Sequence, residues 1–178
     1  MKTPLGVLKM ALRDHVLCAA VFEDGWSDVL ASLARRFGRV ELTGEADAPG
    51  VVARFEAYWA GDVRALDAIV VDPGGTPFQS RVWTALRTVP VGTTVSYGEL
   101  GRTIGAPPGA SRAIGAANGA NPIAVVIPCH RVIASDGTLC GYAGGLERKR
   151  WLLAHEGAPA ARAPEVQGKG GQQEGVGF

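Results

Sequence analysis

The chain has 178 residues, of which 47% are hydrophobic and 20% are charged, and its formal net charge is +1. These proportions are typical of an ordinary globular protein and exclude a disordered, fibrous or large multidomain one. No apolar run approaches the roughly 20 residues of a membrane-spanning helix, and Lys9, Arg13 and Asp14 interrupt the opening segment where a signal peptide is apolar. We therefore expect a cytoplasmic protein with no membrane partner.

Residues 1–73 predict a small α+β unit. Two short apolar segments on either side of Arg13, Asp14 and His15 are typical of an antiparallel hairpin, and later apolar residues recur at the three- and four-residue spacing of amphipathic helices. His15 and Cys18 have no further Cys or His beside them, so we do not expect a metal site here. The predicted elements are strands at 6–12, 16–22 and 65–71 and helices at 26–37 and 51–59, the last ended by Gly61.

The turn-rich run from Asp72 to Pro77 is the predicted linker to a second domain at residues 74–157. Lys and Arg minus Asp and Glu give 8 − 11 = −3 before this run, at residues 1–73, and 8 − 4 = +4 at residues 74–156. This asymmetry is weak evidence for a nucleic-acid surface. Residues 158–178 are rich in Gly, Ala, Gln and Pro without apolar periodicity, which predicts a disordered tail.

The second domain has the pattern of a helix-turn-helix. An apolar stripe predicts a helix at 78–89, and Ser96 and Glu99 have the spacing of a capping box at the start of a short second helix. A turn at 105–109 and a helix of small residues at 110–118 complete the pattern. By itself the pattern is weak evidence for DNA binding, because many helical hairpins that bind nothing look the same.

A cysteine and a histidine follow an apolar run that ends at Pro128. Buried cysteines are usually inert parts of the core, but the polar pair His130 and Arg131 indicates a thiol at the boundary between the core and a polar pocket. Either side chain can lower the pKa of the Cys129 thiol. Neighbouring side chains of an extended segment point to opposite faces, so a direct Cys129–His130 hydrogen bond is not expected without a turn or a bridging water.

The run from Ile127 to Val132, IPCHRV, resembles the motif of the O6-alkylguanine-DNA alkyltransferases, also called methylated-DNA–protein-cysteine methyltransferases. Further family blocks occur in the same order, so the resemblance covers residues 77–157 closely. These blocks lie at 78–83, 91–97, 111–115, 121–122, 141–145 and 149–157. The resemblance implies an α+β fold, with a ribonuclease H-like α/β domain at 1–73 and a mainly helical, winged-helix-like domain at 74–157.

The implied activity is direct-reversal DNA repair, in which an alkyl group passes irreversibly from O6 of guanine, or O4 of thymine, to Cys129. In this mechanism His130 takes the thiol proton through a water, and Glu156 orients the imidazole. Tyr97 protonates the departing guanine, and Asn121 ties the helix-turn-helix to the cysteine loop. The protein is expected to act once, as a monomer, without a small-molecule cofactor or a metal.

The implied partner is double-stranded DNA containing O6-alkylguanine, and cooperative assembly on that DNA is left open. The target nucleotide must leave the stack to be reached, and Arg112 is expected to take its place. Short side chains after Arg112 would let the helix approach the minor groove closely, although they would equally permit close helix packing. The expected DNA-contacting residues are Thr94, Ser96, Arg112, Ala113, Gly115 and Ala116.

The resemblance also implies a pocket for the damaged base. Ala143 stands where some family members carry Ser, so a side-chain hydroxyl contact to O6 is absent. No set of zinc ligands like that of some relatives occurs in the first domain. Cys140 is either a bystander, which we favour, or a second alkylation site. The expected pocket residues are Tyr97, Pro128, Val132, Tyr142 and Ala143.

Three other functions compete with this interpretation. A sensor that binds alkylated DNA without reacting would lack a nucleophile, so Cys129 argues against it. A helix-turn-helix regulator would normally need a dimerisation surface or a further domain. A cysteine hydrolase would need His15 or His155 as a distant base, and no oxyanion-type glycine motif precedes the cysteine.

Overall fold

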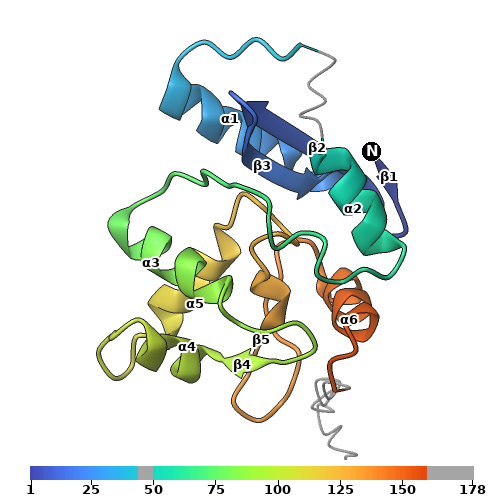
Figure 1. The fold of residues 1–178 in the computed structure, drawn as a ribbon. Coiled ribbons are helices and arrows are strands. Elements are labelled where there is room, and N and C mark those ends of the chain that lie inside the picture. Colours follow the sequence, from blue (N-terminus) through green and yellow to red (C-terminus); the bar gives the residue numbers. More distant parts are fainter. Residues whose placement is uncertain (44–49, 160–178) are drawn as a thin grey trace, which may run out of the picture.

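The computed structural model describes residues 1–43 and 50–159, so the expected tail lies almost entirely outside the described residues. Figure 1 shows two parts. The first strands, α1 and α2 form the upper part, and α3 to α6 gather below them. Within the described ranges, no helix is both long and apolar enough to cross a membrane.

The upper part is a three-stranded antiparallel sheet with two helices, which confirms the predicted hairpin and both predicted helices. Asp14 and His15 close the hairpin with φ of 50° and 66°, the left-handed conformation that a tight hairpin turn requires. The two-residue first strand was not predicted. The elements are β1 (Lys2–Thr3), β2 (Gly6–Arg13), β3 (Val16–Phe22), η1 (Glu23–Gly25), α1 (Trp26–Phe37) and α2 (Val51–Trp59).

The prediction of a strand at 65–71 is wrong. Residues 63–68 form successive turns, with local hydrogen bonds such as Asp67 N to Arg64 O, 3.0 Å. Val71 alone makes a parallel bridge, to Leu17. Ala65, Leu66 and Ile69 are still buried in the core, whereas Val70 is 66% exposed. The apolar pattern therefore predicted burial for most of this stretch but not the backbone conformation.

The lower part contains the predicted helices and the predicted capping box. Ser96 Oγ accepts from Glu99 N at 3.2 Å, while Glu99 Oε2 accepts from Ser96 N at 2.7 Å. Thr76 and Gln79 form a second capping box at the start of α3, where Pro77 takes the first helical position. The elements are α3 (Pro77–Leu86), β4 (Val95–Ser96), α4 (Tyr97–Thr103), α5 (Ser111–Gly119), η2 (Cys129–Arg131), β5 (Val132–Ile133) and α6 (Leu146–His155).

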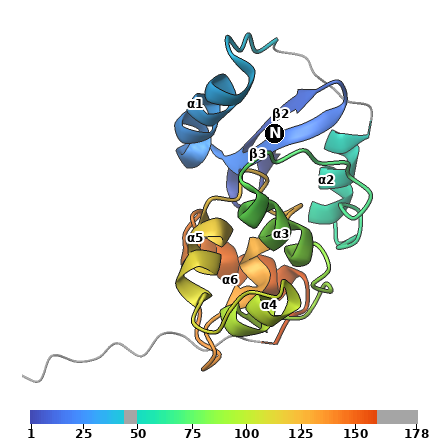
Figure 2. The same cartoon turned by 90° about the vertical axis from the view of Figure 1, so that its left-hand side faces the viewer.

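One hydrophobic core crosses the expected boundary between the two domains. Phe55 of α2 and Leu152 of α6 belong to the same buried cluster as Cys129. The backbone is joined as well, because Ala20 N of β3 donates to Pro122 O at 2.9 Å, and Ala124 N donates back to Ala20 O at 2.7 Å. The chain that leads to Cys129 is therefore anchored on the first sheet (Figure 2).

A substitution at Gly75, in the linker, tests how closely the linker packs against the core. Gly75 has φ +85°, and a Cβ there would lie 2.5 Å from the ring of Trp83, which is 3% exposed. Gly137 has φ +84° with nothing within 4 Å of a Cβ. Both Ala variants carry the left-handed strain of about 1–2 kcal/mol, and Gly75→Ala adds about 1–3 kcal/mol of overpacking. Urea unfolding should therefore show the larger loss for Gly75→Ala; equal losses would contradict the clash.

Candidate active site

Two tight turns and a 3-10 turn carry the cysteine, in place of the expected extended segment. Val126 N donates to Ala124 O at 2.9 Å, and the residue between them, Val125, has φ +71°. A left-handed conformation in a buried β-branched residue costs about 1–3 kcal/mol. Cys129 N then donates to Ile127 O at 2.8 Å around Pro128, and η2 begins at Cys129. The sequence showed the apolar run but not these turns.

Asn121 touches the cysteine sulfur directly. Its Nδ2 lies 3.1 Å from Cys129 Sγ and also donates to Ile127 O at 2.8 Å, while its Oδ1 accepts from Ile123 N at 3.0 Å. One amide therefore holds the cysteine loop and places an N–H against the sulfur. The sequence resemblance indicated only the first of these two roles.

Burial dominates the pKa of the Cys129 thiol and raises it above its ordinary value. The hydrogen bond from Asn121 and the positive charge of Lys149 act in the opposite direction and favour the thiolate. Arg131 was expected to help, but its guanidinium is engaged elsewhere: Nε and Nη2 donate to Glu156 at 2.7 and 3.0 Å. The resting thiol is consequently protonated at neutral pH.

Glu156 is the centre of a buried polar network. His130 Nε2 lies 2.9 Å from Glu156 Oε1, and Tyr58 Oη donates to the same oxygen at 3.0 Å. Burial alone would raise the pKa of Glu156, but the hydrogen bonds from His130 and Arg131 and the positive charge of Arg131 outweigh it and bring the pKa to about 2. Burial also lowers the pKa of His130, so this imidazole is neutral at pH 7.

The other ring nitrogen of His130, Nδ1, is buried without a hydrogen-bond partner among the described residues. Glu156 is ionised, so the tautomer assigned from this network has Nε2–H donating to the carboxylate. Nδ1 then carries a free lone pair beside the cysteine turn. The network thus presents a proton acceptor one residue from the thiol, with no direct Cys129–His130 hydrogen bond.

Sequence reasoning missed Lys149, whose side chain is 0% exposed. Its Nζ lies 2.5 Å from Val132 O, 2.6 Å from Cys140 O and 3.5 Å from Gly141 O. Three carbonyls match the three N–H donors of an ammonium group. Lys149 thereby pins the loop at 132–141 and places a positive charge near Cys129; the only signal in the sequence was a lysine within an otherwise recognisable block.

The expected pocket residues are only partly brought together. A cavity of about 60 Å³ beside Cys129 is lined by Tyr142 and Ala143, with Ala124 and residues of β3 and η1 completing it. Tyr97 and Val132 do not line this cavity, and Pro128 lines a different one. Tyr97 Oη instead lies 3.9 Å from Cys140 Sγ, while the hydroxyl of Tyr142 is buried and unpartnered within the described structure.

The expected DNA-contacting residues lie on neighbouring elements. Thr94 and Ser96 lie at β4, where Ser96 also caps α4, and the other four lie on α5. Arg112, Ala113 and Ala116 are exposed on α5. Packing against the neighbouring helices is carried by the buried residues of α5, Ile114 and Ala117, so the exposed small residues are free of that task. Gly115 faces the ring of Tyr97, where a Cβ would lie 3.7 Å from Cε1.

Comparisons with known proteins agree with this arrangement. Residues 77–158 match the family model described as 6-O-methylguanine DNA methyltransferase, DNA binding domain. The methylated-DNA–protein-cysteine methyltransferase of Salmonella typhimurium is 44% identical over 158 residues, which are 87% of this chain and 92% of that protein. The chain belongs to the methylated-DNA–protein-cysteine methyltransferase family.

Solved structures support the same assignment of this methyltransferase over both parts of the chain. The O6-methylguanine methyltransferase of Mycobacterium tuberculosis is 41% identical, with a TM-score of 0.68 over 90% of this chain and 93% of its own. Mycobacterium tuberculosis OGT in complex with DNA gives the same TM-score and coverage at 39% identity. The mixed helix and sheet fold is therefore that of the family.

The Glu156 network makes the free energy of unfolding of the methyltransferase fall at acid pH. Because the folded-state pKa of Glu156 is depressed, its contribution is complete above about pH 4.5 and is lost as the pH falls toward 2. From the pKa values, the loss is of order 3 kcal/mol. Urea unfolding from pH 7 to 2 should show this slope flattened in Glu156→Gln, which also starts less stable. Glu147→Gln, on the exposed face of α6, should keep the wild-type slope; a parallel Glu156→Gln curve would contradict the assignment.

Proposed function

We infer that this protein repairs DNA by direct reversal, moving the alkyl group of O6-alkylguanine irreversibly onto Cys129. Family membership supports the reaction, and one observation carries its assignment to this residue. Cys129 Sγ receives the Asn121 N–H at 3.1 Å, and the neighbouring His130 is held by Glu156 with Nδ1 free. A nucleophile, an N–H donor to the developing thiolate and a proton acceptor thus come from adjacent residues.

We propose the following order of bond changes. His130 Nδ1 accepts the thiol proton through a bridging water, and the thiolate of Cys129 attacks the alkyl carbon. The C–O6 bond breaks and its electron pair passes to the guanine, which takes a proton from Tyr97. Burial raises the pKa of Tyr97, so this hydroxyl is a neutral donor at pH 7. The C–S bond of the thioether is not readily hydrolysed, so each protein molecule reacts once.

The cavity of about 60 Å³ next to Cys129 supports a place for the transferred group. A methyl group occupies about the space of one water molecule, near 30 Å³, and fits this volume. Ala143 and Tyr142 line the cavity, consistent with a pocket wall at these positions. Tyr97, Val132 and Pro128 would contact the base itself; O4-alkylthymine is a second substrate under this proposal.

The proposed DNA partner is a duplex that contains the lesion. Its minor groove is read by α5, Arg112 replaces the flipped nucleotide, and the exposed Ala113 and Ala116 allow close approach. The half-buried Gly115 supports the Tyr97 ring, and Thr94 and Ser96 contact the backbone from β4. Asn121 connects this helix pair to the cysteine loop through its hydrogen bonds to Ile127 O and Cys129 Sγ.

We propose that residues 1–73 form a ribonuclease H-like domain and residues 74–157 a winged-helix-like one. The antiparallel sheet with α1 and α2 supports the first, and the α4–turn–α5 unit beside the short β4–β5 pair supports the second. The protein acts as a cytoplasmic monomer without a metal or other cofactor. A non-reacting sensor or a helix-turn-helix regulator is a weaker alternative, because neither needs a cysteine held in this way.

Methylation of Cys129 is the decisive measurement. The protein is incubated with a duplex containing one O6-methylguanine and then analysed by intact and peptide mass spectrometry. We expect one added methyl group per protein, on the Cys129 peptide, and none in Cys129→Ser. If the protein still bound the duplex but gained no mass, it would be a sensor or a regulator and not a repair protein. A methyl group on the Cys140 peptide would show that Cys140 is the nucleophile.

A variant of Arg112 distinguishes base flipping from the alkyl transfer step. Arg112→Ala should slow repair of O6-methylguanine in a duplex at least tenfold while leaving reaction with a free O6-alkylguanine base nearly unchanged, because only the duplex requires a vacated stack to be filled. Arg150→Ala, which removes an exposed charge from α6, should change neither rate. Equal losses on both substrates would refute the flipping role of Arg112.

A further inference from the structure

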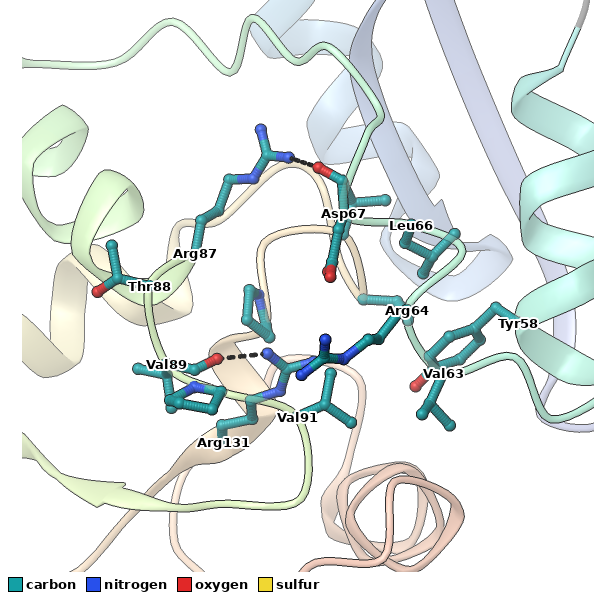
Figure 3. A pocket seen from close by; sticks show the side chains of 14 residues that line it. Tyr58, Val63, Arg64, Leu66, Asp67, Arg87, Thr88, Val89, Val91 and Arg131 are labelled. Carbon is teal, nitrogen blue, oxygen red and sulfur yellow. Dashed lines mark hydrogen bonds between the residues drawn. The ribbon is translucent and has the colours of Figure 1, made fainter.

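A second cavity, of about 290 Å³, lies where the turns at 63–68 meet the segment at 87–91 and the far side of the cysteine turn. Figure 3 looks into it. Its walls come from both parts of the molecule, and Val125, Val126, Pro128 and Arg131 connect it to the segment that carries Cys129. It shares no lining residue with the cavity beside the Cys129 sulfur.

Three arginines from three separate segments line this cavity: Arg64, Arg87 and Arg131. In Figure 3 the guanidinium groups of Arg64 and Arg131 point into the same space, together with the carboxylate of Asp67. The chain as a whole has a net charge of only +1, so this concentration of arginine does not follow from composition. The three arginines outnumber the single carboxylate of Asp67, and a concave wall with net positive charge raises the local concentration of anions.

The donors of these arginines are only partly used by the protein. Arg87 Nη2 donates to the carbonyls of Asp67 and Ile69, and Arg131 is paired with Glu156 and donates to Val89 O. The exposed Arg64 guanidinium has no hydrogen bond or ion pair with another described residue. Two arginines that are already hydrogen-bonded and one that is not therefore face one cavity. The carboxylate of Asp67 forms an ion pair with none of the three.

We propose that this cavity is an anion-binding site for a phosphate group, held by Arg64 with support from Arg87 and Arg131. Guanidinium groups match phosphate oxygens in geometry and charge. The charged part of the wall consists of the three arginines and Asp67, and the rest is mainly aliphatic. The one aromatic side chain of the lining, Tyr58, is committed to Glu156. A compact, strongly charged ligand fits these walls better than an extended apolar one.

The site is physically linked to the reacting residues without belonging to them. Arg131 lines the cavity with one face and holds Glu156 with Nε and Nη2, so an anion there shares a cation with the carboxylate that orients His130. The strained Val125 turn forms part of the wall four residues before Cys129. This site goes beyond the proposed repair reaction, which needs no second ligand.

Calorimetric titration with pyrophosphate, at constant ionic strength adjusted with chloride, tests the proposal. The wild type should bind one pyrophosphate saturably. Arg64→Ala should bind at least tenfold more weakly, since it loses charge-assisted hydrogen bonds, whereas Arg150→Ala should match the wild type. Asp67→Asn should bind more tightly by threefold or more, and Glu147→Gln should not. No saturable binding, or equal weakening in both arginine variants, would overturn the site.

The same variants show that the outcome is independent of repair and of folding. Arg64 is exposed, and its side chain has no hydrogen bond or ion pair within residues 1–43 and 50–159. Arg64→Ala should therefore keep its unfolding midpoint and should still accept one methyl group on Cys129. If the wild type failed to accept methyl but bound pyrophosphate through Arg64, the repair function alone would be refuted.

A competition experiment distinguishes the two sources of a phosphate group. Displacement of pyrophosphate by an undamaged duplex, with a salt slope that falls by about 1 in Arg64→Ala, identifies the DNA backbone as the ligand. Simultaneous binding of duplex and pyrophosphate identifies a free phosphate compound. Either result supports the site; pyrophosphate displaced by the duplex equally in Arg64→Ala and the wild type, at equal affinity, would contradict the role of Arg64.

Discussion

The buried carboxylate of Glu156 is the interaction on which the rest of the site depends. Removing a carboxylate from water costs several kcal/mol unless its oxygens are fully satisfied. Here they receive Tyr58 from α2, His130 and Arg131 from η2, all converging at the end of α6. Since the donors come from both parts of the molecule, satisfying one charge fixes the seam between the parts, the orientation of the imidazole and the turn that carries Cys129.

The resting thiol is held in a protected state. Burial raises the pKa of Cys129, while Asn121 and Lys149 favour the thiolate without prevailing. Oxidation and unwanted alkylation both require a thiolate that is exposed. A protein that can react only once loses its function by any side reaction, so a protonated thiol on a residue that is 6% exposed is suited to a single use. In the proposed reaction, the neighbouring His130 accepts the thiol proton when a substrate is bound.

Local signals in the sequence predicted most helices, both hairpin strands and the capping box at Ser96, because each depends on residues within a few positions of one another. The prediction of a strand at 65–71 was wrong because apolar spacing indicates burial and not backbone conformation. The pairing of His130 with Glu156 was reached through family resemblance. The engagement of Arg131 and the buried Lys149 were missed, since they depend on contacts between separate segments of the chain. The left-handed Val125 was missed because a valine within an apolar run carries no local signal of that conformation.

The geometry around the sulfur also explains how the product can be tolerated. A methyl group added at a closely packed atom normally costs about 1–3 kcal/mol, because neighbours must leave their rotamers. The adjoining cavity of about 60 Å³ can take a methyl group without such displacement. Methylation nevertheless replaces the thiolate that the Asn121 N–H would stabilise during the reaction by a thioether, which is a much weaker acceptor. Asn121 keeps its bonds to Ile127 O and Ile123 N, so the loop remains anchored while the single contact specific to the reactive sulfur is weakened.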